Sequence, residues 1–440
     1  MAPLDYRIEP GGQLQGRLRV PGDKSISHRA LLLGAIAEGE TRIEGFLPGA
    51  DCLATLAALR ALGVEAATPA PDRVVVRGRG REGLRAPKSP LDLGNSGTAM
   101  RLLAGLLAGQ DFTSTLTGDD SLSRRPMRRV IEPLAEMGVR IESRDGKAPL
   151  TIHGTRPLKP LRYAMPVASA QVKSALLIAG LYAGGYTWIR EPGPSRDHTE
   201  RMLEAFGHEC LWEDAWVGIH GGGSLHGTQI DVPGDLSSAA FFLVGAAMCP
   251  GSRLVLENVG VNPTRDGVIR ILRAMGADIR IVNPRDRGAE PVADIEVQGA
   301  RLKAVEIDPE LVALAIDDIP AVLIAAATAE GVTRVHGAAE LRVKESDRLE
   351  AMHAGLSALG ITTTLSEDGI SVMGVERFRG GVIQSHGDHR IAMAFAMAAL
   401  KAASPLTILD CANVDTSFPG FVAAAEQLGL PIHSGGRRAA

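Results

Sequence analysis

Residues 20–29 read VPGDKSISHR, and residues 232–245 repeat the turn as VPGDLSSAAFFLVG. In both copies a Pro-Gly-Asp turn leads into an apolar helical segment, which indicates that one structural unit begins twice in the chain. The second copy has apolar residues in place of two cations of the first, Leu236 for Lys24 and Phe241 for Arg29. Because the scaffold forms without these two cations, we infer that they are candidates for chemistry and not for folding.

The first copy also has the features of an anion site. Ser25 is predicted to be the N-cap, since its hydroxyl can accept from the first free backbone N–H groups. A helix N-terminus attracts anions, and Lys24 before that end and Arg29 one turn inside add positive charge. The stretch indicates half of a phosphate or carboxylate site; the alternative is a capped helix with solvated charges.

The composition excludes several classes of protein. The 440 residues, 45% hydrophobic and 22% charged, suit a globular chain of two or three domains. A net charge of −4 argues against a general binder of nucleic acids or membrane surfaces. The first residues lack the apolar run of a signal peptide, and no apolar stretch approaches the ~20 residues of a membrane span.

The cysteines are scattered and form no CxxC pair, which argues against a zinc site or a thioredoxin-like site. Such residues are typical of small buried hydrophobes in a reducing compartment. We therefore expect a cytoplasmic protein without a nucleic-acid or membrane partner. The cysteines are Cys52, Cys210, Cys249 and Cys411.

An internal repeat gives the fold class. An apolar helix rich in small residues, followed by a break and a short β-rich run, recurs six times. Because these helices are apolar on nearly every face, sheets must cover them. We expect an α/β fold of two domains with three α/β units each, residues 20–235 in the first and residues 1–19 plus 236–440 in the second. The helices are expected at 28–37, 98–107, 171–183, 237–248, 319–329 and 390–402, and the strands at 41–45, 113–117, 186–190, 253–257, 332–336 and 406–409.

A glycine pattern at residues 78–83, GRGREG, imitates a dinucleotide-binding loop after a plausible strand. Residues 84–90, LRAPKSP, cannot form the helix whose N-terminus would bind the pyrophosphate. We therefore predict no dinucleotide site there.

Two segments in the first half combine small residues or proline with cations. In residues 93–101, LGNSGTAMR, Gly97 allows a ligand to approach the backbone and Arg101 lies one turn inside a helix. In residues 121–129, SLSRRPMRR, Pro126 suits the first turn of a helix, so Arg125 should precede its N-terminus. The alternatives are a glycine turn with a cap and a solvated basic turn.

A third segment, residues 341–348 with the sequence LRVKESDR, is expected to open a helix through 359. Lys344 and Arg348 would then share a face, where like charges destabilise the helix unless an anion binds between them. Lys344 with Glu345 is also a workable proton-transfer pair. The alternative is a surface helix with ordinary salt bridges.

The fourth segment, residues 386–390, reads HGDHR. Its two histidines and Asp388 suggest a metal, but a third strong ligand at helical spacing is absent. We favour Asp388 orienting His389, with Arg390 facing an anion. The helix dipole disfavours cations at N-termini, so the cations near helix starts point to an interdomain cleft that binds phosphates and carboxylates. These are Lys24, Arg29, Arg101, Arg125, Lys344, Arg348 and Arg390.

Together the segments resemble the 5-enolpyruvylshikimate-3-phosphate synthase family of enolpyruvyl transferases. The motifs PGDKSISHR, GNSGTAMR, SRRPM, SAQVKSALL, RVKESDRL and DHRIAM occur in family order over essentially the whole chain. The resemblance implies two inverse α/β domains joined by a two-stranded hinge near residues 20–24 and 232–237. It implies transfer of the enolpyruvyl group of phosphoenolpyruvate to the 5-hydroxyl of shikimate 3-phosphate, with release of phosphate, by a monomeric enzyme without metal or organic cofactor.

The resemblance also implies roles for residues that match the family motifs. Addition across the enol double bond needs a base for the hydroxyl and an acid for the methylene carbon, and elimination from the tetrahedral intermediate reverses both transfers. The catalytic candidates are Asp317, Glu345, Lys344 and Lys24, with Arg101 and His389 in support. Shikimate 3-phosphate would be held by Lys24, Ser25, Arg29, Ser169, Ala170, Gln171, Arg196, Asp317 and Lys344. Phosphoenolpyruvate would be held by Lys24, Asn95, Gly97, Arg125, Gln171, Arg348 and Arg390.

Some positions depart from the better-known family pattern. Glu340 stands where many members have Asn, and Thr416 where many have a Lys that contacts phosphoenolpyruvate. Ala170 replaces a Ser beside the phosphate, and Arg196 is expected to compensate. These features resemble the divergent class that includes glyphosate-tolerant enzymes, although Gly97 keeps the glycine that some tolerant members replace with Ala.

The motifs leave two alternative functions. The sister transferase acting on UDP-N-acetylglucosamine shares the fold but usually carries a reactive Cys on a mobile loop, and residues 118–127 contain none. A repeat-built binding or clamp protein without catalysis would not need the cluster of Lys344, Glu345 and Arg348. Both alternatives are less consistent with the motifs than the shikimate enzyme.

Overall fold

The structure is a computed structural model that describes residues 4–287 and 289–436. By its internal contacts the chain divides into two compact units. Unit 1 comprises Met1–Pro21, Pro233–Arg285 and Pro291–Ala440, and unit 2 comprises Gly22–Val232 and Asp286–Glu290.

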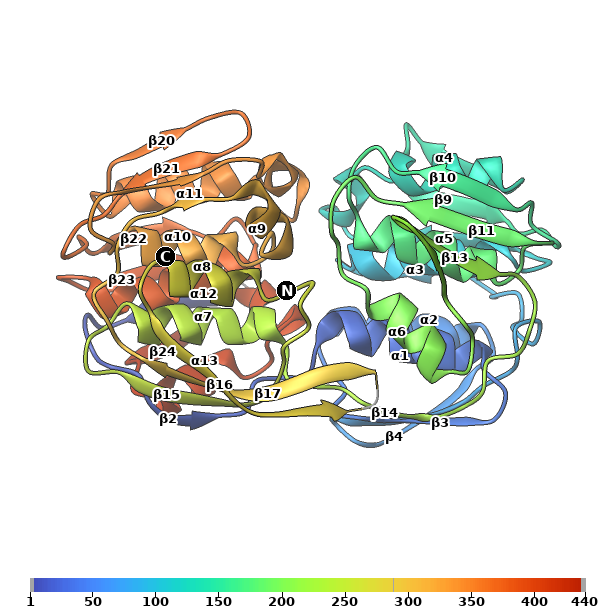
Figure 1. Cartoon of the computed structure of the whole chain (residues 1–440), viewed down its shortest axis with the longest axis horizontal. Helices are drawn as coiled ribbons and strands as arrows, with labels where there is room; N and C mark the ends of the chain where they lie inside the picture. The colour runs from blue at the N-terminus through green and yellow to red at the C-terminus, as the bar shows by residue number, and fades with distance from the viewer. Residues whose placement is uncertain (1–3, 288, 437–440) are drawn as a thin grey trace. The chain divides into compact units, whose positions relative to one another are not determined.

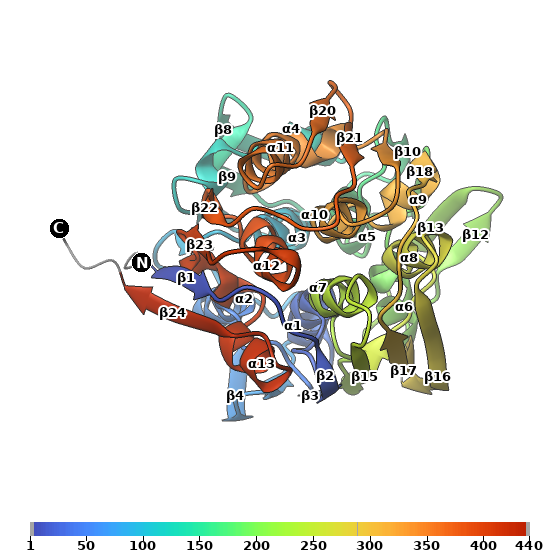
Figure 2. The ribbon, with the colours of Figure 1, turned by 90° about the vertical axis from the view of Figure 1, so that its left-hand side faces the viewer.

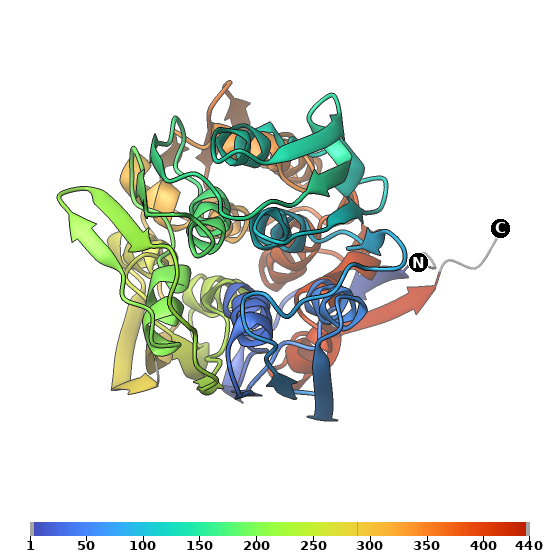
Figure 3. The same cartoon turned by 90° about the vertical axis from the view of Figure 1, so that its right-hand side faces the viewer.

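Three apolar helices form the core of unit 2, namely α1 (Lys24–Ile36), α3 (Gly97–Ala108) and α5 (Ala170–Gly180). Figure 3 shows these helices end-on, in blue, teal and green. Small residues let them approach closely: a Cβ added at Gly105 of α3 would lie 2.1 Å from the carbonyl oxygen of Ala175 on α5. The packing explains why the helices are apolar on every face.

Each core helix of unit 2 is accompanied by a four-stranded sheet with one parallel pair and two antiparallel pairs. The strand orders are β14-β3-β5-β4, β6-β7-β9-β8 and β10-β11-β13-β12. The strands are β3 (Glu40–Glu44), β4 (Glu65–Ala70), β5 (Arg73–Arg77), β6 (Leu91–Asp92), β7 (Thr113–Thr117), β8 (Arg140–Arg144), β9 (Lys147–His153), β10 (Leu161–Ala164), β11 (Tyr186–Arg190), β12 (Leu211–Glu213), β13 (Trp216–His220) and β14 (Gln229–Asp231). The remaining helices are α2 (Ala50–Ala61), η1 (Leu122–Arg124), α4 (Arg128–Glu136) and α6 (His198–Ala205).

Unit 1 repeats the plan around α7 (Leu236–Ala247), α10 (Ile319–Ala326) and α12 (His389–Ala398), which lie side by side in Figure 2. Its sheets have the orders β16-β17-β15-β2, β18-β19-β21-β20 and β22-β23-β1-β24. The strands are β1 (Leu4–Ile8), β2 (Gln15–Leu18), β15 (Arg253–Gly260), β16 (Asp278–Arg287), β17 (Glu290–Gln298), β18 (Glu306–Ile307), β19 (Val332–Val335), β20 (Thr363–Leu365), β21 (Ile370–Met373), β22 (Gly381–Gln384), β23 (Leu406–Leu409) and β24 (Ile432–Gly436). The other helices are α8 (Gly267–Ala274), α9 (Pro309–Leu314), η2 (Ala339–Val343), α11 (Arg348–Ala358), η3 (Ala399–Lys401), η4 (Ala412–Thr416) and α13 (Phe421–Gln427).

The predicted sixfold repeat and the α/β fold class are confirmed, because each expected helix and strand has its counterpart in the order of elements along the chain. Figure 1 labels the six core helices, α1, α3, α5, α7, α10 and α12. The first two strands, which lie in the segment 1–19 expected to join the second domain, pair with strands of unit 1: β1 pairs with β23 and β24, and β2 pairs with β15. Residues 286–290 belong to unit 2 although both flanking stretches belong to unit 1. The hinge near residues 20–24 and 232–237 stays a prediction.

The start of α1 differs from the prediction. Asp23, not Ser25, is the N-cap, and its carboxylate accepts from the backbone N–H of Ile26 at 2.9 Å. Lys24 is therefore the first residue of the helix rather than the residue before it. A cap is chosen among neighbouring polar residues by the backbone angles of the turn, and here the Pro-Gly-Asp turn places Asp23 at the cap.

Two further helix starts were predicted wrongly. Helix α4 begins at Arg128 with Met127 as N-cap, so Pro126 precedes the helix instead of occupying its first turn. Helix α11 begins at Arg348 with Asp347 as N-cap, and Lys344 is the C-cap that follows the short helix η2. Lys344 and Arg348 therefore do not share a helix face, because the chain breaks its helical path between them.

The loop at residues 78–83 continues into residues 84–90 without a helix, as predicted. All four cysteines are buried free thiols. Among residues 4–287 and 289–436, no helix has both the length and the apolar character that crossing a bilayer requires.

Candidate active site

The first group of predicted residues lies at the N-terminus of α1 in unit 2. Lys24 Nζ is 3.2 Å from Asp51 Oδ2, and both side chains are largely buried. Arg29 is 1% exposed, and its Nη1 donates to the carbonyl oxygen of Ser25 at 2.8 Å. Burial lowers the pKa of Arg29 to about 10, which still leaves the guanidinium charged at neutral pH. The turn thus carries two cations, one of which holds its backbone.

Arg29 is also fixed from two other helices. Its Nε donates to Thr199 Oγ1 of α6 at 2.7 Å, and its Nη2 donates to Ser174 Oγ of α5 at 2.7 Å. The positive charge of Arg196, in the loop before α6, also lowers the pKa of Arg29, although less than burial does. Two predicted cations are therefore electrostatic neighbours, an arrangement that an anion between them would relieve.

A second group joins the N-termini of α3 and α5. Arg101 Nη1 donates to Gln171 Oε1 at 2.6 Å, and Gln171 Nε2 donates to Thr98 Oγ1 at 2.9 Å. Arg125 Nη2 donates to Asn95 Oδ1 at 2.5 Å. The structure thus groups Asn95, Gly97, Arg101, Arg125 and Gln171, which come from three separate motifs.

Gly97 lies between the two arginines of this group. A Cβ added there would lie 2.9 Å from Arg125 Nη1 and 3.0 Å from Arg101 Nη1, closer than real side chains pack. The glycine therefore permits two guanidinium groups to reach the N-terminus of α3, where backbone N–H groups also attract anions.

Ser169 and Ala170 form the start of α5. Ser169 is the N-cap, with Oγ accepting from the backbone N–H of Val172 at 3.4 Å. Its own N–H donates to Glu191 Oε1 at 3.3 Å. Ala170 is the first helical residue, and its carbonyl oxygen accepts from Ser174 Oγ at 2.6 Å.

In unit 1 the predicted residues gather around Asp317. Its Oδ1 lies 3.6 Å from Lys344 Nζ and 3.2 Å from Arg348 Nη1. Arg390 Nη1 donates to the carbonyl oxygen of Asp317 at 2.8 Å, and Arg390 Nη2 is 4.0 Å from Asp317 Oδ2. Three predicted cations therefore surround one predicted carboxylate.

Arg348 is held from two further sides. Its Nε is 2.8 Å from Asp388 Oδ2, and its Nη2 is 2.5 Å from Glu345 Oε2. Burial alone would lower the pKa of Arg348, but attraction to Asp388, Glu345 and Asp317 outweighs it and raises the pKa above its usual value. The guanidinium is a permanent buried charge with a fixed orientation.

Asp388 serves this cation and the helix start. It caps α12 by accepting from the backbone N–H of Arg390 at 2.9 Å, and it accepts from Ser346 Oγ at 3.0 Å. The suggested metal site at His386, Asp388 and His389 gains no support from this geometry. Across the described part of the chain, no group of three or more His, Cys, Asp and Glu side chains is arranged to hold a metal ion. The orientation of His389 by Asp388 stays a prediction.

Two of the departures from the family pattern, Thr416 and Glu340, lie in short helices of unit 1. Thr416, in η4, is buried and donates to the carbonyl oxygen of Asn413 at 2.7 Å. Glu340 lies in η2, directly before the segment that carries Lys344. A buried ion network in unit 2 joins three residues that were not among the predicted site residues, Lys173, Glu191 and Glu200. The one sequence feature that indicates this network is a lysine, Lys173, within the otherwise apolar helical run QVKSALL.

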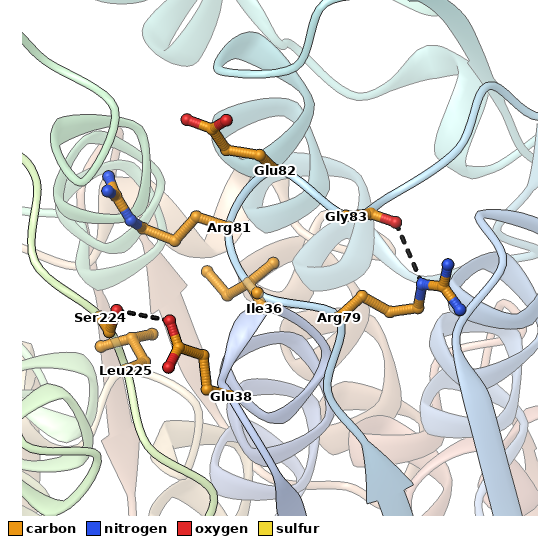
Figure 4. A pocket seen from close by; sticks show the side chains of 9 residues that line it. Ile36, Glu38, Arg79, Arg81, Glu82, Gly83, Ser224 and Leu225 are labelled. Carbon is orange, nitrogen blue, oxygen red and sulfur yellow. Dashed lines mark hydrogen bonds between the residues drawn. The ribbon is translucent and has the colours of Figure 1, made fainter.

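A separate pocket of about 270 Å³ lies in unit 2, and Figure 4 shows its lining. The lining includes Arg79 and Arg81 from the glycine-patterned loop. The polar groups have protein partners: Arg79 Nε donates to the carbonyl oxygen of Gly83 at 3.1 Å, and Glu38 Oε1 accepts from Ser224 Oγ at 2.6 Å. The pocket shares no lining residue with the predicted site.

Comparison with known proteins gives one consistent family. The profile of the family described as EPSP synthase (3-phosphoshikimate 1-carboxyvinyltransferase) matches residues 8–424. The 3-phosphoshikimate 1-carboxyvinyltransferase of Alkalilimnicola ehrlichii is 61% identical over 433 residues, covering 98% of this chain and 97% of the relative. That of Halorhodospira halophila is 58% identical over 433 residues, covering 98% of each. A solved EPSP synthase structure from Acinetobacter baumannii has a TM-score of 0.88 at 51% identity and covers 98% of this chain and 100% of that one.

Proposed function

The chain belongs to the EPSP synthase family of 3-phosphoshikimate 1-carboxyvinyltransferases, and we propose that the two groups of side chains described above are the residues that carry its reaction. The enzyme transfers the enolpyruvyl group of phosphoenolpyruvate to the 5-hydroxyl of shikimate 3-phosphate and releases phosphate, a step of the shikimate pathway that leads to aromatic amino acids. The family match over residues 8–424 carries this conclusion and removes both the nucleotide-sugar transferase and the non-catalytic module.

The shikimate 3-phosphate roles fall mainly on unit 2. The N-termini of α1 and α5 supply Ser25 and Ser169 hydroxyls and backbone N–H groups, which suit a phosphate. Arg29 fixes the Ser25 backbone and adds charge, and Arg196 adds a second cation where Ala170 offers no hydroxyl. Lys24, Gln171, Asp317 and Lys344 complete the proposed set.

The phosphoenolpyruvate roles fall on arginines that are already oriented. Arg125 is held by Asn95, and Arg348 is held by three carboxylates, so neither must be ordered when the ligand binds. Planar guanidinium groups match carboxylate and phosphate oxygens in pairs. With Lys24, Gly97, Gln171 and Arg390 they form the proposed set.

Asp317, Lys344 and Glu345 are the proposed proton-transfer groups. In the addition, one of them takes the proton of the 5-hydroxyl while another protonates the methylene carbon, which gives a tetrahedral intermediate with a methyl group. In the elimination, a proton leaves that methyl group and the phosphate departs, so the enol double bond forms again. The ion pair of Lys344 with Asp317 places a proton donor and an acceptor 3.6 Å apart.

We further propose that the enzyme acts as a monomer in the cytoplasm. The four buried thiols are consistent with a reducing compartment, and the monomer follows from the family resemblance. Light scattering on the purified protein, with an expected mass of 46.3 kDa, tests the oligomeric state.

The decisive experiment for the reaction is phosphate release from phosphoenolpyruvate with either shikimate 3-phosphate or UDP-N-acetylglucosamine as acceptor. We expect release with shikimate 3-phosphate alone. Release with the nucleotide sugar alone would leave the fold assignment intact and show that the proposed acceptor substrate is wrong.

A further inference from the structure

A buried lysine in the first turn of α5 forms ion pairs with two carboxylates. Lys173 is 4% exposed, and its Nζ is 2.7 Å from Glu191 Oε2 and 2.8 Å from Glu200 Oε1. Burial by itself would lower the pKa of Lys173, but the attraction of Glu200 and Glu191 for the ammonium group is larger and raises the pKa. The motif match gives none of these three residues a role toward a substrate.

Stability alone does not explain such a group. Burying one ammonium and two carboxylates carries a desolvation cost, and replacing buried ion pairs by apolar side chains is often neutral or even stabilising. A network of this kind is therefore better explained by what it holds in place.

Glu191 contacts two loops that carry proposed ligand residues. Its Oε1 accepts from the backbone N–H of Ser169 at 3.3 Å and from Ser195 Oγ at 2.5 Å. Ser169 caps α5, and Ser195 immediately precedes Arg196. A single carboxylate oxygen thus joins the start of α5 to the loop that presents Arg196.

The other end of the network reaches Arg29. Glu200 follows Thr199 on α6, and Lys173 precedes Ser174 on α5. Thr199 Oγ1 donates to Ser174 Oγ at 2.7 Å, and the same threonine accepts from Arg29 Nε at 2.7 Å. Two adjacent pairs of residues therefore clamp α5 to α6 beside Arg29, which holds Ser25 on α1.

From these contacts we propose that Glu191 is a positioning residue for shikimate 3-phosphate. Its carboxylate is fixed by Lys173, which Glu200 holds from the other side. It sets the distance between the Ser169 cap and Arg196, so that both reach the same phosphate group. The inference rests on the proposed assignment of Ser169 and Arg196 to this substrate. It predicts an effect on shikimate 3-phosphate that phosphoenolpyruvate does not share.

Two variants test this role, with one matched control. Ser195→Ala removes one hydrogen bond to Glu191 and keeps all three charged side chains, Lys173, Glu191 and Glu200. Glu191→Ala removes both loop contacts. Ser224→Ala is the control, because Ser224 Oγ makes the same kind of bond to Glu38 Oε1 at 2.6 Å in the same unit. The readouts are the KM of each substrate, kcat, the Kd of shikimate 3-phosphate by calorimetry and the melting temperature.

For Ser195→Ala we expect the KM and Kd of shikimate 3-phosphate to rise about fivefold, and for Glu191→Ala at least about tenfold, as loss of bonds to a charged group implies. The KM of phosphoenolpyruvate should change less than about twofold, and Ser224→Ala should change neither KM. The double variant should be no worse than Glu191→Ala, because the serine acts through the glutamate.

Two results would overturn the inference: an equal rise in both KM values, or a lower melting temperature with an unchanged KM for shikimate 3-phosphate. If Glu191→Ala does not fold, Ser195→Ala still decides the matter. Lys24→Met separates this inference from the proposed site. If Lys24→Met abolishes turnover while Ser195→Ala leaves the KM unchanged, the proposed site stands and only the role of Glu191 falls.

Discussion

Arg348 and Asp388 form a buried ion pair across 40 residues of sequence, with Nε 2.8 Å from Oδ2 and side chains that are 1% and 0% exposed. The pair connects the start of α11 to the start of α12, and it orients the guanidinium that also contacts Asp317 and Glu345. The positions of the proposed proton-transfer groups and the stability of unit 1 therefore depend on the same ion pair.

Removing Asp388 should expose this coupling. Asp388→Ala leaves the buried Arg348 guanidinium without its one fully buried carboxylate partner, and we expect the free energy of unfolding to fall by ~3–5 kcal/mol. Urea denaturation measures the loss. The matched control is Glu44→Ala, which breaks the exposed pair of Glu44 with Arg73 and should cost at most ~1 kcal/mol. Equal losses in the two variants would contradict the structural role of the buried pair.

Gly97→Ala should weaken phosphoenolpyruvate binding selectively. The added Cβ would lie 2.9 Å from Arg125 Nη1 and 3.0 Å from Arg101 Nη1, so both guanidinium groups must move. We expect the KM of phosphoenolpyruvate to rise about tenfold, since a small displacement of a positioning group is costly. Steady-state kinetics measures this, with Gly435→Ala as the control because a Cβ there meets nothing within 4 Å. An unchanged KM would show that neither arginine binds this substrate.

Lys24→Met should abolish turnover for electrostatic reasons. Lys24 pairs with Asp51 at 3.2 Å, so the substitution also leaves a largely buried carboxylate unpaired. We expect kcat/KM to fall at least about 100-fold, because the variant loses the positive charge that we propose contacts both substrates. The double variant Lys24→Met/Asp51→Asn should regain stability but not activity, as thermal melts and phosphate release would show. Recovery of both would assign Lys24 a structural role only.

His28 predicts a pH dependence of stability. Its ring is buried, Nδ1 lies 2.8 Å from Thr55 Oγ1, and burial together with Lys24 and Arg29 lowers its pKa to about 3. In the unfolded chain His28 binds a proton with a pKa of 6.5, whereas in the folded protein its pKa is about 3. The unfolded state therefore binds more protons between these values, and the free energy of unfolding decreases as pH falls from about 6.5 towards 3. The loss approaches ~1.4 kcal/mol per pH unit for one proton.

Unfolding measured between pH 6 and 5 tests this prediction. His28→Gln, which cannot gain a charge, should show a shallower decline than the parent protein. Carboxylates titrate in both proteins, so only the difference in slope counts. Identical slopes would mean that the folded protein accepts a proton on His28 in this range.

The sequence determined the fold because its signals are local and periodic. Six helices that are apolar on every face can only be buried, and six helix–strand pairs with the turn at residue 20 repeated at residue 232 divide naturally into two sets of three. The family motifs then identified the reaction. These features depend on residue type and spacing within one segment, which a chain displays before it folds.

Tertiary structure decided how the side chains meet. Within a few residues of a turn, several polar groups compete for the cap, and backbone angles selected Asp23 over Ser25. Backbone angles also place Lys344 outside helix α11, yet its side chain still contacts Asp317. Contacts over long distances in the chain, such as Arg348 with Asp388 and Lys173 with Glu191 and Glu200, depend on which helix starts pack together. No local pattern encodes them, because electrostatic energy depends on separation in space and on burial, not on separation along the chain.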